Sequence, residues 1–356
     1  MSLTGKIKSY SIFSKNILLS SAGRLNHPYK LTFAITNKCN LRCKTCHIWK
    51  KKPVDELSTE EIDKFFRVNN FFNWIDLTGG EIFLRKDLLD ITKSIKNNIK
   101  NLVLLHYPTN GFLTERIVEF TEEISSLDFN NLVLTVSLDG KKDIHNEIRG
   151  NNKAFDRCIE TYKELKKNKY VKVYLGCTLS PFNINYFKNF FTELKDYIPD
   201  LKYSDIHLNI YHYSENLYSN EPMLFDKQKI INLIDDFIRK KGLSFLNPIS
   251  LLEYTYMKNI KNYLSSDKTP FNCKSGRISC FIEPTGNVYP CTGFNIVLGN
   301  LRKNNFDLLK ILANEKSTIL SKQIRNGKCP QCWTPCEAYQ NILSNLFIKE
   351  KNNGYN

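Results

Sequence analysis

The segment Thr36–His47 reads TNKCNLRCKTCH and places Cys39, Cys43 and Cys46 at the spacing C-x3-C-x2-C. Iron–sulfur clusters are held by cysteine thiolates, normally four for a [4Fe–4S] cluster. Three neighbouring thiolates without a local fourth therefore indicate a cluster with one iron left open. A catalytic metal site keeps such an open coordination position, whereas a structural site closes it.

A zinc site is the main alternative for these three cysteines. Zinc ribbons and knuckles usually pair two C-x2-C motifs, or combine one with a pair of histidines. His47 directly follows Cys46, which is too close for both side chains to bind one ion easily. A disulfide ranks lower, because the chain has no secretory signal and cysteine-rich cytosolic proteins more often bind metals or perform redox chemistry. Zinc stays open at this point.

Short β-like runs alternate with segments of helical periodicity between residues 29 and 211. The predicted strands are 29–36, 74–78, 102–107, 132–138, 171–179 and 206–211, and the predicted helices are 59–68, 88–95, 115–124, 154–166 and 186–197. This alternation predicts βαβ units around a parallel sheet, and six strands are enough for most of a barrel. In such barrels the functional residues lie at the carboxyl ends of the strands.

Further motifs follow the predicted strands at those carboxyl ends. They are LTGGE at 77–81, YPTNG at 107–111, VSLDG at 136–140, and His145 with Arg149-Gly150. Glycines allow a close approach of the backbone to a ligand, and the guanidinium of Arg149 matches the shape of a carboxylate. The motifs and the cysteine segment are therefore expected to meet at one rim, around a nucleotide-like ligand.

Together these motifs resemble the radical S-adenosylmethionine (SAM) superfamily, over roughly residues 30–212 and again over 273–336. The resemblance implies an α/β fold, a partial (β/α)6 TIM-like barrel, in which the open iron chelates SAM and the reduced cluster cleaves it to a 5′-deoxyadenosyl radical. It implies cluster ligation by Cys39, Cys43 and Cys46, and SAM contacts from Gly79, Gly80, Glu81, Asn110, Ser137, Asp139 and Arg149. Glu81 is the expected partner of the SAM amino group, Asp139 or Ser137 of the ribose, and Arg149 of the carboxylate. Ile82 replaces a proline common in the family, with little expected effect.

A second cysteine group consists of Cys273, Cys280, Cys291, Cys329, Cys332 and Cys336. The apolar pairs 281–282 and 288–289 flank the turn 284–287, which predicts a β-hairpin. Taken alone, the group also fits a zinc ribbon. Beside a radical SAM core it resembles the small twitch or SPASM extension, which binds auxiliary [4Fe–4S] clusters. The complete SPASM pattern has seven or more cysteines and ends differently, so at least one auxiliary cluster is expected and a second is in doubt.

The resemblance also implies which of these cysteines bind an auxiliary cluster. The single-cluster arrangement of the family carries over to Cys273, Cys291, Cys329 and Cys332, with Cys280 and Cys336 as alternates. A rival arrangement places Cys273, Cys280, Cys291 and Cys336 around one cluster. Cys158 and Cys177 fall on a predicted helix and strand, and we interpret both as core residues, because free cysteine is often buried.

Length and charge suggest how the chain is organised. Its 356 residues allow about two domains. We expect a basic N-terminal extension (1–29), the barrel (30–212), a helical bridge (213–268) with helices at 228–240 and 251–263, an auxiliary-cluster domain (269–345) and a flexible tail (346–356). Without a signal peptide or an apolar run of about 20 residues, the sequence predicts a cytoplasmic protein. We expect the extension to pack on the barrel. Binding to a membrane surface is the alternative, and it ranks lower.

Three functions stay open from the sequence. The first is a radical SAM enzyme that modifies a peptide or protein side chain by thioether formation, carbon–carbon crosslinking, epimerisation or oxidation. The second is a radical SAM enzyme acting on a small molecule, a sugar or a lipid headgroup, and the third is a non-catalytic zinc-stabilised binding protein.

The charge and the family also suggest partners and catalytic groups. The net charge of +15 suits an acidic substrate, whereas nucleic acid is not expected, because no RNA-binding motif accompanies the charge. An electron donor such as flavodoxin or ferredoxin is implied by the family. Thr292 replaces the aspartate base of the formylglycine-forming maturases, which argues against that activity. The catalytic acid or base is not identified, although Tyr211, His212 and Tyr213 follow the sixth strand.

Overall fold

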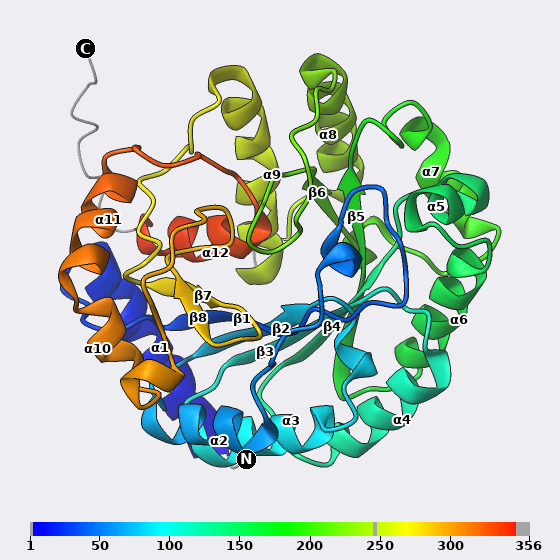
Figure 1. Ribbon diagram of the computed structural model, residues 1–356. Helices are drawn as coiled ribbons and strands as arrows, with labels where there is room; N and C mark the ends of the chain where they lie inside the picture. Colours follow the sequence, from blue (N-terminus) through cyan, green and yellow to red (C-terminus); the bar gives the residue numbers. More distant parts are fainter. Residues whose placement is uncertain (1–2, 245–247, 347–356) are drawn as a thin grey trace.

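One continuous sheet organises the computed structural model, which describes residues 3–244 and 248–346 (Figure 1). Six parallel strands follow one another in sequence order: β1 (Lys30–Thr36), β2 (Trp74–Gly79), β3 (Leu104–Thr109), β4 (Leu132–Ser137), β5 (Val171–Leu179) and β6 (Ile206–Ile210). The predicted strands are confirmed to within two residues at either end. The parallel sheet confirms the prediction of a partial barrel.

Helices cover the outer face of this curved sheet (Figure 1). They are α2 (Thr59–Val68), α3 (Leu88–Asn98), α4 (Thr114–Ser125), α5 (Lys142–Arg149), α6 (Ala154–Lys166) and α7 (Phe190–Lys195). Helix α2 begins with a capping box, because the Ser58 hydroxyl accepts from the Glu61 N–H and the Glu61 carboxylate accepts from the Ser58 N–H. The predicted helix 186–197 divides into a 3-10 turn (Phe187–Asn189) and α7.

The strands point alternate side chains toward the helices and toward the barrel interior. On β1, Leu31 and Phe33 are fully buried in the main hydrophobic core, which the helices complete. The interior is polar instead. The buried ammonium of Lys30 lies 3.1 Å from the Asp76 carboxylate, which also lies 3.3 Å from His106 Nδ1. Three neighbouring strands thus contribute one connected polar group to the interior.

The predicted hairpin forms and extends the barrel sheet. Strand β7 (Ser279–Ile282) pairs in parallel with β1, β8 (Asn287–Tyr289) pairs antiparallel with β7, and β9 (Gly299–Asn300) ends the sheet. The sequence predicted the hairpin but not its pairing with β1. The pairing has a physical reason, because β1 would otherwise leave a row of unpaired backbone groups at its edge.

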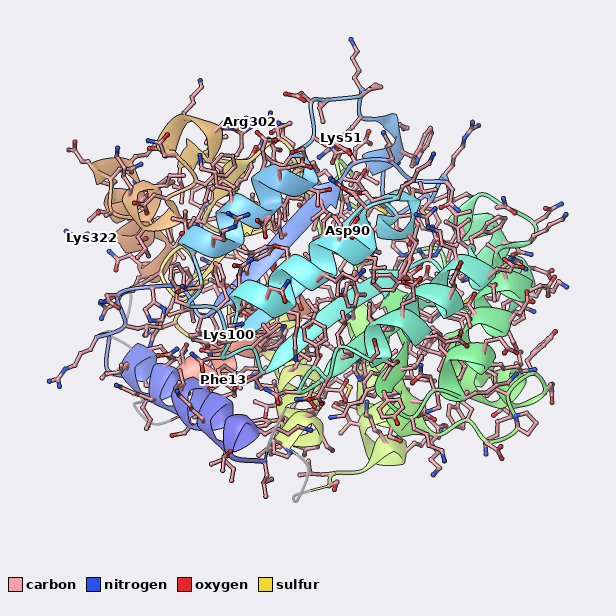
Figure 2. The ribbon with its side chains drawn as sticks, turned by 90° about the horizontal axis from the view of Figure 1, so that it is seen from below. Phe13, Lys51, Asp90, Lys100, Arg302 and Lys322 are labelled. Atoms are coloured by element: carbon pink, nitrogen blue, oxygen red, sulfur yellow. The ribbon has the colours of Figure 1, made fainter. Side chains whose placement is uncertain are left out.

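The remaining helices pack around the open side and the underside of the barrel. They are α8 (Lys227–Lys241), α9 (Pro248–Ser266), α10 (Leu308–Leu312), α11 (Glu315–Arg325) and α12 (Pro335–Ser344), and α8 and α9 confirm the two helices predicted for 213–268. The helix α1 (Leu3–Ser21) lies along the underside (Figure 2). It packs on the barrel through an Asn16–Asn73 hydrogen bond of 2.7 Å and an edge contact between Phe13 and Tyr29.

In the described ranges, none of the helices combines the length and the apolar character needed to cross a membrane. The predicted flexible tail lies outside the described residues, apart from Leu346.

Candidate active site

The cysteine loop, which we define as residues 37–47, leaves β1 and crosses the carboxyl ends of the strands. On one side it is held by the loop after β2, because the Gly80 N–H donates to the Thr36 carbonyl and the Glu81 N–H to the Lys38 carbonyl, both at 2.8 Å. The start of the loop is therefore fixed by main-chain hydrogen bonds, which are formed without a ligand.

The end of α5 holds the other side of the cysteine loop. The Arg42 N–H donates to the Arg149 carbonyl at 3.2 Å, and the Lys44 N–H to the Ile148 carbonyl at 2.8 Å. Gly150 ends α5 with a φ of +65°. A Cβ there would lie 2.6 Å from the Arg42 carbonyl oxygen, so glycine permits the close contact.

The two glycines after β2 serve the same purpose. A Cβ at Gly79 would lie 2.1 Å from the Thr36 oxygen, and one at Gly80 would lie 2.1 Å from the Lys38 oxygen. The sequence analysis expected these glycines to allow a ligand to approach. The structure shows that they allow the cysteine loop to approach; both glycines also line the cavity, so their contact with a ligand stays a prediction.

All ten residues predicted for the radical cluster and for SAM line one cavity of about 220 Å³. These are Cys39, Cys43, Cys46, Gly79, Gly80, Glu81, Asn110, Ser137, Asp139 and Arg149. Other elements also contribute to its lining, among them Tyr211, His212, Tyr218, Thr334 and Cys336. Tyr213, which the sequence analysis grouped with Tyr211 and His212, does not line the cavity and is about half exposed.

Glu81 connects two loops of the rim. Its Oε1 accepts from the Thr109 hydroxyl at 2.9 Å and from the Phe83 N–H at 3.3 Å, and its Oε2 accepts from the Asn110 N–H at 2.8 Å. Burial raises the pKa of Glu81 to about 7, although these hydrogen bonds oppose the shift. The carboxylate expected to meet the SAM amino group thus already binds three donors of the protein.

Asp139 and Arg149 form a buried ion pair at the cavity wall. Arg149 Nη2 lies 2.6 Å from Asp139 Oδ2, while Asp139 Oδ1 accepts from the Thr178 N–H at 3.1 Å. Arg149 Nη1 also lies 3.8 Å from Cys43 Sγ. Arg149 is therefore already paired with Asp139, and its predicted contact with the SAM carboxylate stays a prediction. Its Nε alone has no partner among the described residues.

The three thiols of the cysteine loop fit an iron–sulfur cluster in their chemistry. Burial raises the pKa of Cys39 to about 11 and that of Cys46 to about 12, so the free thiols stay protonated until a metal displaces the protons. They pack with Leu41 and Phe112 in a small apolar group. Soft thiolates in such surroundings suit iron–sulfur clusters.

A single zinc ion is the alternative for these side chains. Zinc would hold its sulfur ligands about 3.8 Å apart, given Zn–S bonds of about 2.3 Å in tetrahedral geometry. Within residues 3–244 and 248–346, no three His, Cys, Asp or Glu side chains are placed to hold one metal ion, which applies to both cysteine groups alike.

Four of the C-terminal cysteines come together at the other end of the strands. Cys273 precedes β7 and Cys291 follows β8, and because these strands are antiparallel, both cysteines reach the same edge of the sheet. Burial raises the pKa of Cys273 to about 12, and the nearby Cys329 adds to the shift. Burial also raises the pKa of Cys291, as do the nearby Cys332 and Cys273. Cys273, Cys291, Cys329 and Cys332 are therefore neighbours.

Cys280 and Cys336 stand apart from this group. Cys280 lies on β7, opposite Leu31 of β1, with 1% of its surface exposed. Cys336 lies in the first turn of α12 and lines the cavity of the cysteine loop. Its carbonyl oxygen accepts a hydrogen bond from Lys30. The choice of cluster ligands among the six cysteines stays a prediction, with Cys280 and Cys336 as the alternates.

Glu337 was missed by the sequence analysis. It is fully buried beside the four cysteines and accepts from the Ser275 hydroxyl at 2.7 Å and from the Gln340 amide at 2.9 Å. The Thr292 N–H donates to it at 3.3 Å. Burial raises the pKa of Glu337. A single glutamate next to Cys336 carries no pattern in the sequence that would mark it.

The wall opposite the cysteine loop carries polar atoms without partners. They are His212 Nε2 and Thr334 Oγ1, which make no hydrogen bond within the described part of the chain. Burial lowers the pKa of His212 to about 4, so the ring is neutral at physiological pH. Buried polar groups normally have hydrogen-bond partners. The cavity therefore fits a ligand that brings polar groups of its own.

Two sequence profiles match this chain. That of the radical SAM superfamily matches residues 33–194, and that of an iron–sulfur cluster-binding domain, SPASM, matches residues 273–336. The chain belongs to the radical SAM superfamily. It is a radical SAM enzyme that uses SAM, a SAM-binding [4Fe–4S] cluster and at least one auxiliary [4Fe–4S] cluster, which confirms the prediction from the motifs.

Curated relatives extend over most of the chain. The subtilosin biosynthesis protein AlbA of Bacillus subtilis is 24% identical in an alignment 341 positions long, which covers 88% of this chain and 68% of AlbA. An AdoMet-dependent heme synthase of Oleidesulfovibrio alaskensis is 24% identical over 318 residues, covering 85% of this chain and 79% of that protein. A probable GTP 3′,8-cyclase of Methanocaldococcus jannaschii is 34% identical over 144 residues, or 37% of this chain and 47% of the cyclase.

Solved structures share the fold. Native anSMEcpe with bound AdoMet superimposes with a TM-score of 0.60 at 20% identity, covering 89% of this chain and 94% of that one. Streptococcus suis SuiB bound to S-adenosylmethionine superimposes with a TM-score of 0.59 at 15% identity, covering 85% and 70%.

Proposed function

We propose that Cys39, Cys43 and Cys46 hold the SAM-binding cluster and that the cavity beside them takes SAM. When bound, the reduced cluster supplies the electron that cleaves SAM to a 5′-deoxyadenosyl radical, which abstracts hydrogen from the substrate. Two features support this assignment. The cysteine loop is fixed by main-chain hydrogen bonds on both sides, and the cavity next to it carries polar atoms that lack partners.

The residues of the rim have different roles in this proposal. Ser137, which lines the cavity, and Arg149 Nε, which has no partner among the described residues, are the groups assigned to SAM, whereas Glu81 and Asp139 position the rim through their hydrogen bonds within the protein. Arg149 also places a positive charge 3.8 Å from Cys43 Sγ, where it stabilises a thiolate.

We assign one auxiliary cluster to Cys273, Cys291, Cys329 and Cys332. Cys329 and Cys332 close a short chelate at little cost in loop entropy, and the hairpin brings Cys273 and Cys291 to the same edge of the sheet. Burial of four thiolates beside Glu337 would concentrate negative charge, so the iron ions must compensate it.

We propose a peptide or protein side chain as the substrate. The observation that carries this proposal is the charge of the cavity. Among its lining residues the only lysine or arginine is Arg149, and Asp139 already neutralises it. A nucleoside triphosphate would need several cations around its phosphates, whereas neutral His212, Thr334 and Cys336 suit the uncharged amide groups of a peptide.

The relatives support the same class of substrate. AlbA acts in the biosynthesis of a bacteriocin, and its similarity covers 88% of this chain. Structures of the same fold include SuiB bound to the precursor peptide SuiA and anSMEcpe with a peptide. The heme synthase, which matches a similar share of the chain, favours a small molecule as the second candidate, and a neutral sugar fits the charge argument equally well.

Isotope transfer distinguishes the candidates. Anaerobically purified holoenzyme is mixed with dithionite, SAM and a deuterated candidate peptide, and 5′-deoxyadenosine is analysed by mass spectrometry. We expect deuterium in 5′-deoxyadenosine and a matching change in peptide mass. Transfer from a deuterated small molecule, with none from peptide, would replace the proposal by its second candidate.

A further inference from the structure

A second cavity, of about 440 Å³, opens at the opposite end of the barrel. We call it the basic groove. It lies between the end of α1, the segment that precedes β7 and the helices α10 and α11, and its cationic lining residues are Arg24, Lys274, Arg277, Lys322 and Arg325. No aspartate or glutamate of the described residues lines it, and Cys273 forms part of its wall.

Three of these cations carry charge that no carboxylate neutralises. Arg24, Arg277 and Lys322 are exposed and form no ion pair within the described ranges. Arg277 donates instead to the backbone carbonyls of Gly23 and of Leu25, which hold the guanidinium in place without cancelling its charge. Lys322 projects from the flank formed by the C-terminal helices (Figure 2).

The basic groove and the SAM cavity lie at opposite ends of β1. Asn26 and Pro28 of the groove precede this strand, and the cysteine loop follows it. Seven residues of strand span about 20 Å at about 3.3 Å per residue. A substrate that reacts in the SAM cavity has no need of this surface, whereas a partner that serves the auxiliary cysteines would meet Cys273 there.

Packed residues connect the two cysteine groups through the interior. Tyr256 stacks on Trp333, next to Cys332, with 5.9 Å between ring centroids. Cys336 follows in the cavity wall, and the carbonyl oxygen of Tyr218 in the same wall lies 3.8 Å from Cys46 Sγ. Buried aromatic and cysteine side chains thus lie between the two cysteine groups.

We propose that the basic groove docks an acidic electron-transfer protein, which exchanges single electrons with the auxiliary cluster at Cys273. In each exchange the partner loses one electron and the cluster gains one, and no covalent bond forms or breaks. Each SAM cleavage consumes one electron from outside the chain, and opposite charges speed the encounter of redox partners. The proposal rests on the auxiliary ligand set assigned above.

The test uses reduced bacterial flavodoxin and the holoenzyme. Arg277→Glu combined with Lys322→Glu should weaken flavodoxin binding about tenfold at low ionic strength, and the difference should shrink at high salt. Lys322→Glu alone should act in the same direction without disturbing the backbone contacts of Arg277. SAM cleavage driven by dithionite should stay unchanged in both variants.

A matched control changes the net charge equally on a distant face. Lys169→Glu with Lys188→Glu alters two exposed lysines near α6 and α7, and flavodoxin affinity should not change beyond the general effect of net charge. Equal weakening by both pairs, or by neither, would overturn the proposal. So would a loss of peptide conversion in the groove variants under dithionite, because the groove would then bind an acidic peptide.

Measuring the affinity for flavodoxin distinguishes a failure of the docking proposal from a failure of the assigned cluster ligands. If Cys273→Ala left the iron content unchanged, the ligand set would be wrong, whereas the affinity for flavodoxin would still report on the groove.

Discussion

The carboxylate of Asp139 lies 2.6 Å from the guanidinium of Arg149, in a buried ion pair directly beside Cys43. The two residues come from the loop after β4 and from the end of α5, so the pair fixes α5 against the rim. The last carbonyls of α5 in turn accept hydrogen bonds from the cysteine loop. The ion pair therefore stabilises the position of the cluster site indirectly, through α5.

Asp139→Asn should therefore destabilise the protein. Removing one partner of a buried ion pair leaves an uncompensated charge and typically costs about 3–5 kcal/mol. Urea unfolding under anaerobic conditions measures the loss. The control is Asp156→Asn, which removes the exposed pair with Lys142 and should cost at most about 1 kcal/mol. Equal losses in the two variants would show that the Asp139 pair has no special role.

The buried carboxyl group of Glu81 should make the stability of the folded protein depend on pH. Its carboxyl group has a pKa of about 7 in the folded state, against 4.5 as the ordinary value. The folded state therefore binds more protons in this window, and stability should fall as the pH rises from about 4.5 to 7. Glu81→Gln lacks the titration, so the wild type should lose stability relative to the variant across this window. A constant difference between pH 5 and 8 would contradict the account.

Gly80→Ala tests whether the cysteine loop requires the close contact with the loop after β2. The new Cβ would overlap the Lys38 carbonyl oxygen, so the loop must shift and iron content should drop, with a loss of about 1–3 kcal/mol in stability. Gly293→Ala is the matched control, because a Cβ there meets no atom within 4 Å. Full iron occupancy in Gly80→Ala would mean that the close contact is dispensable.

The contributions of Lys30 and Asp76 to the stability of the barrel should be energetically coupled. Burial would raise the pKa of Asp76, but Lys30 and His106 hold it well below its usual range. Lys30→Met should cost about 3–5 kcal/mol at neutral pH, because the buried Asp76 carboxylate then loses its lysine partner and keeps only His106 and the Trp74 N–H. Lys30→Met combined with Asp76→Asn should recover part of that loss in a double-mutant cycle. Strictly additive losses would rule out the coupling.

The strands and the rim could be predicted from the sequence because their signals are local. Alternation within β5 and the helical period of 154–166 give the elements, and cysteine spacing with Gly-Gly-Glu gives the site. The pairing of β7 with β1 could not be predicted, because residues about 250 positions apart share no local pattern.

The roles of charged residues were also out of reach of the sequence. Arg149 resembled a free carboxylate ligand until the structure paired it with Asp139. Glu337 and Lys30 lie in segments without a motif, and their burial depends entirely on tertiary packing. Residue type suggests a possible partner, but the fold decides which partner is used.

Iron content and SAM cleavage, measured together, test the central claim most directly. One radical cluster and one auxiliary cluster require about eight irons per chain, at four per cluster. Cys280→Ala and Cys336→Ala should keep that number. Replacing Cys39, Cys43 and Cys46 by alanine should leave about four irons and abolish formation of 5′-deoxyadenosine. About twelve irons in the wild type would contradict the single auxiliary cluster, and unchanged SAM cleavage in the triple variant would contradict the assignment of the cysteine loop.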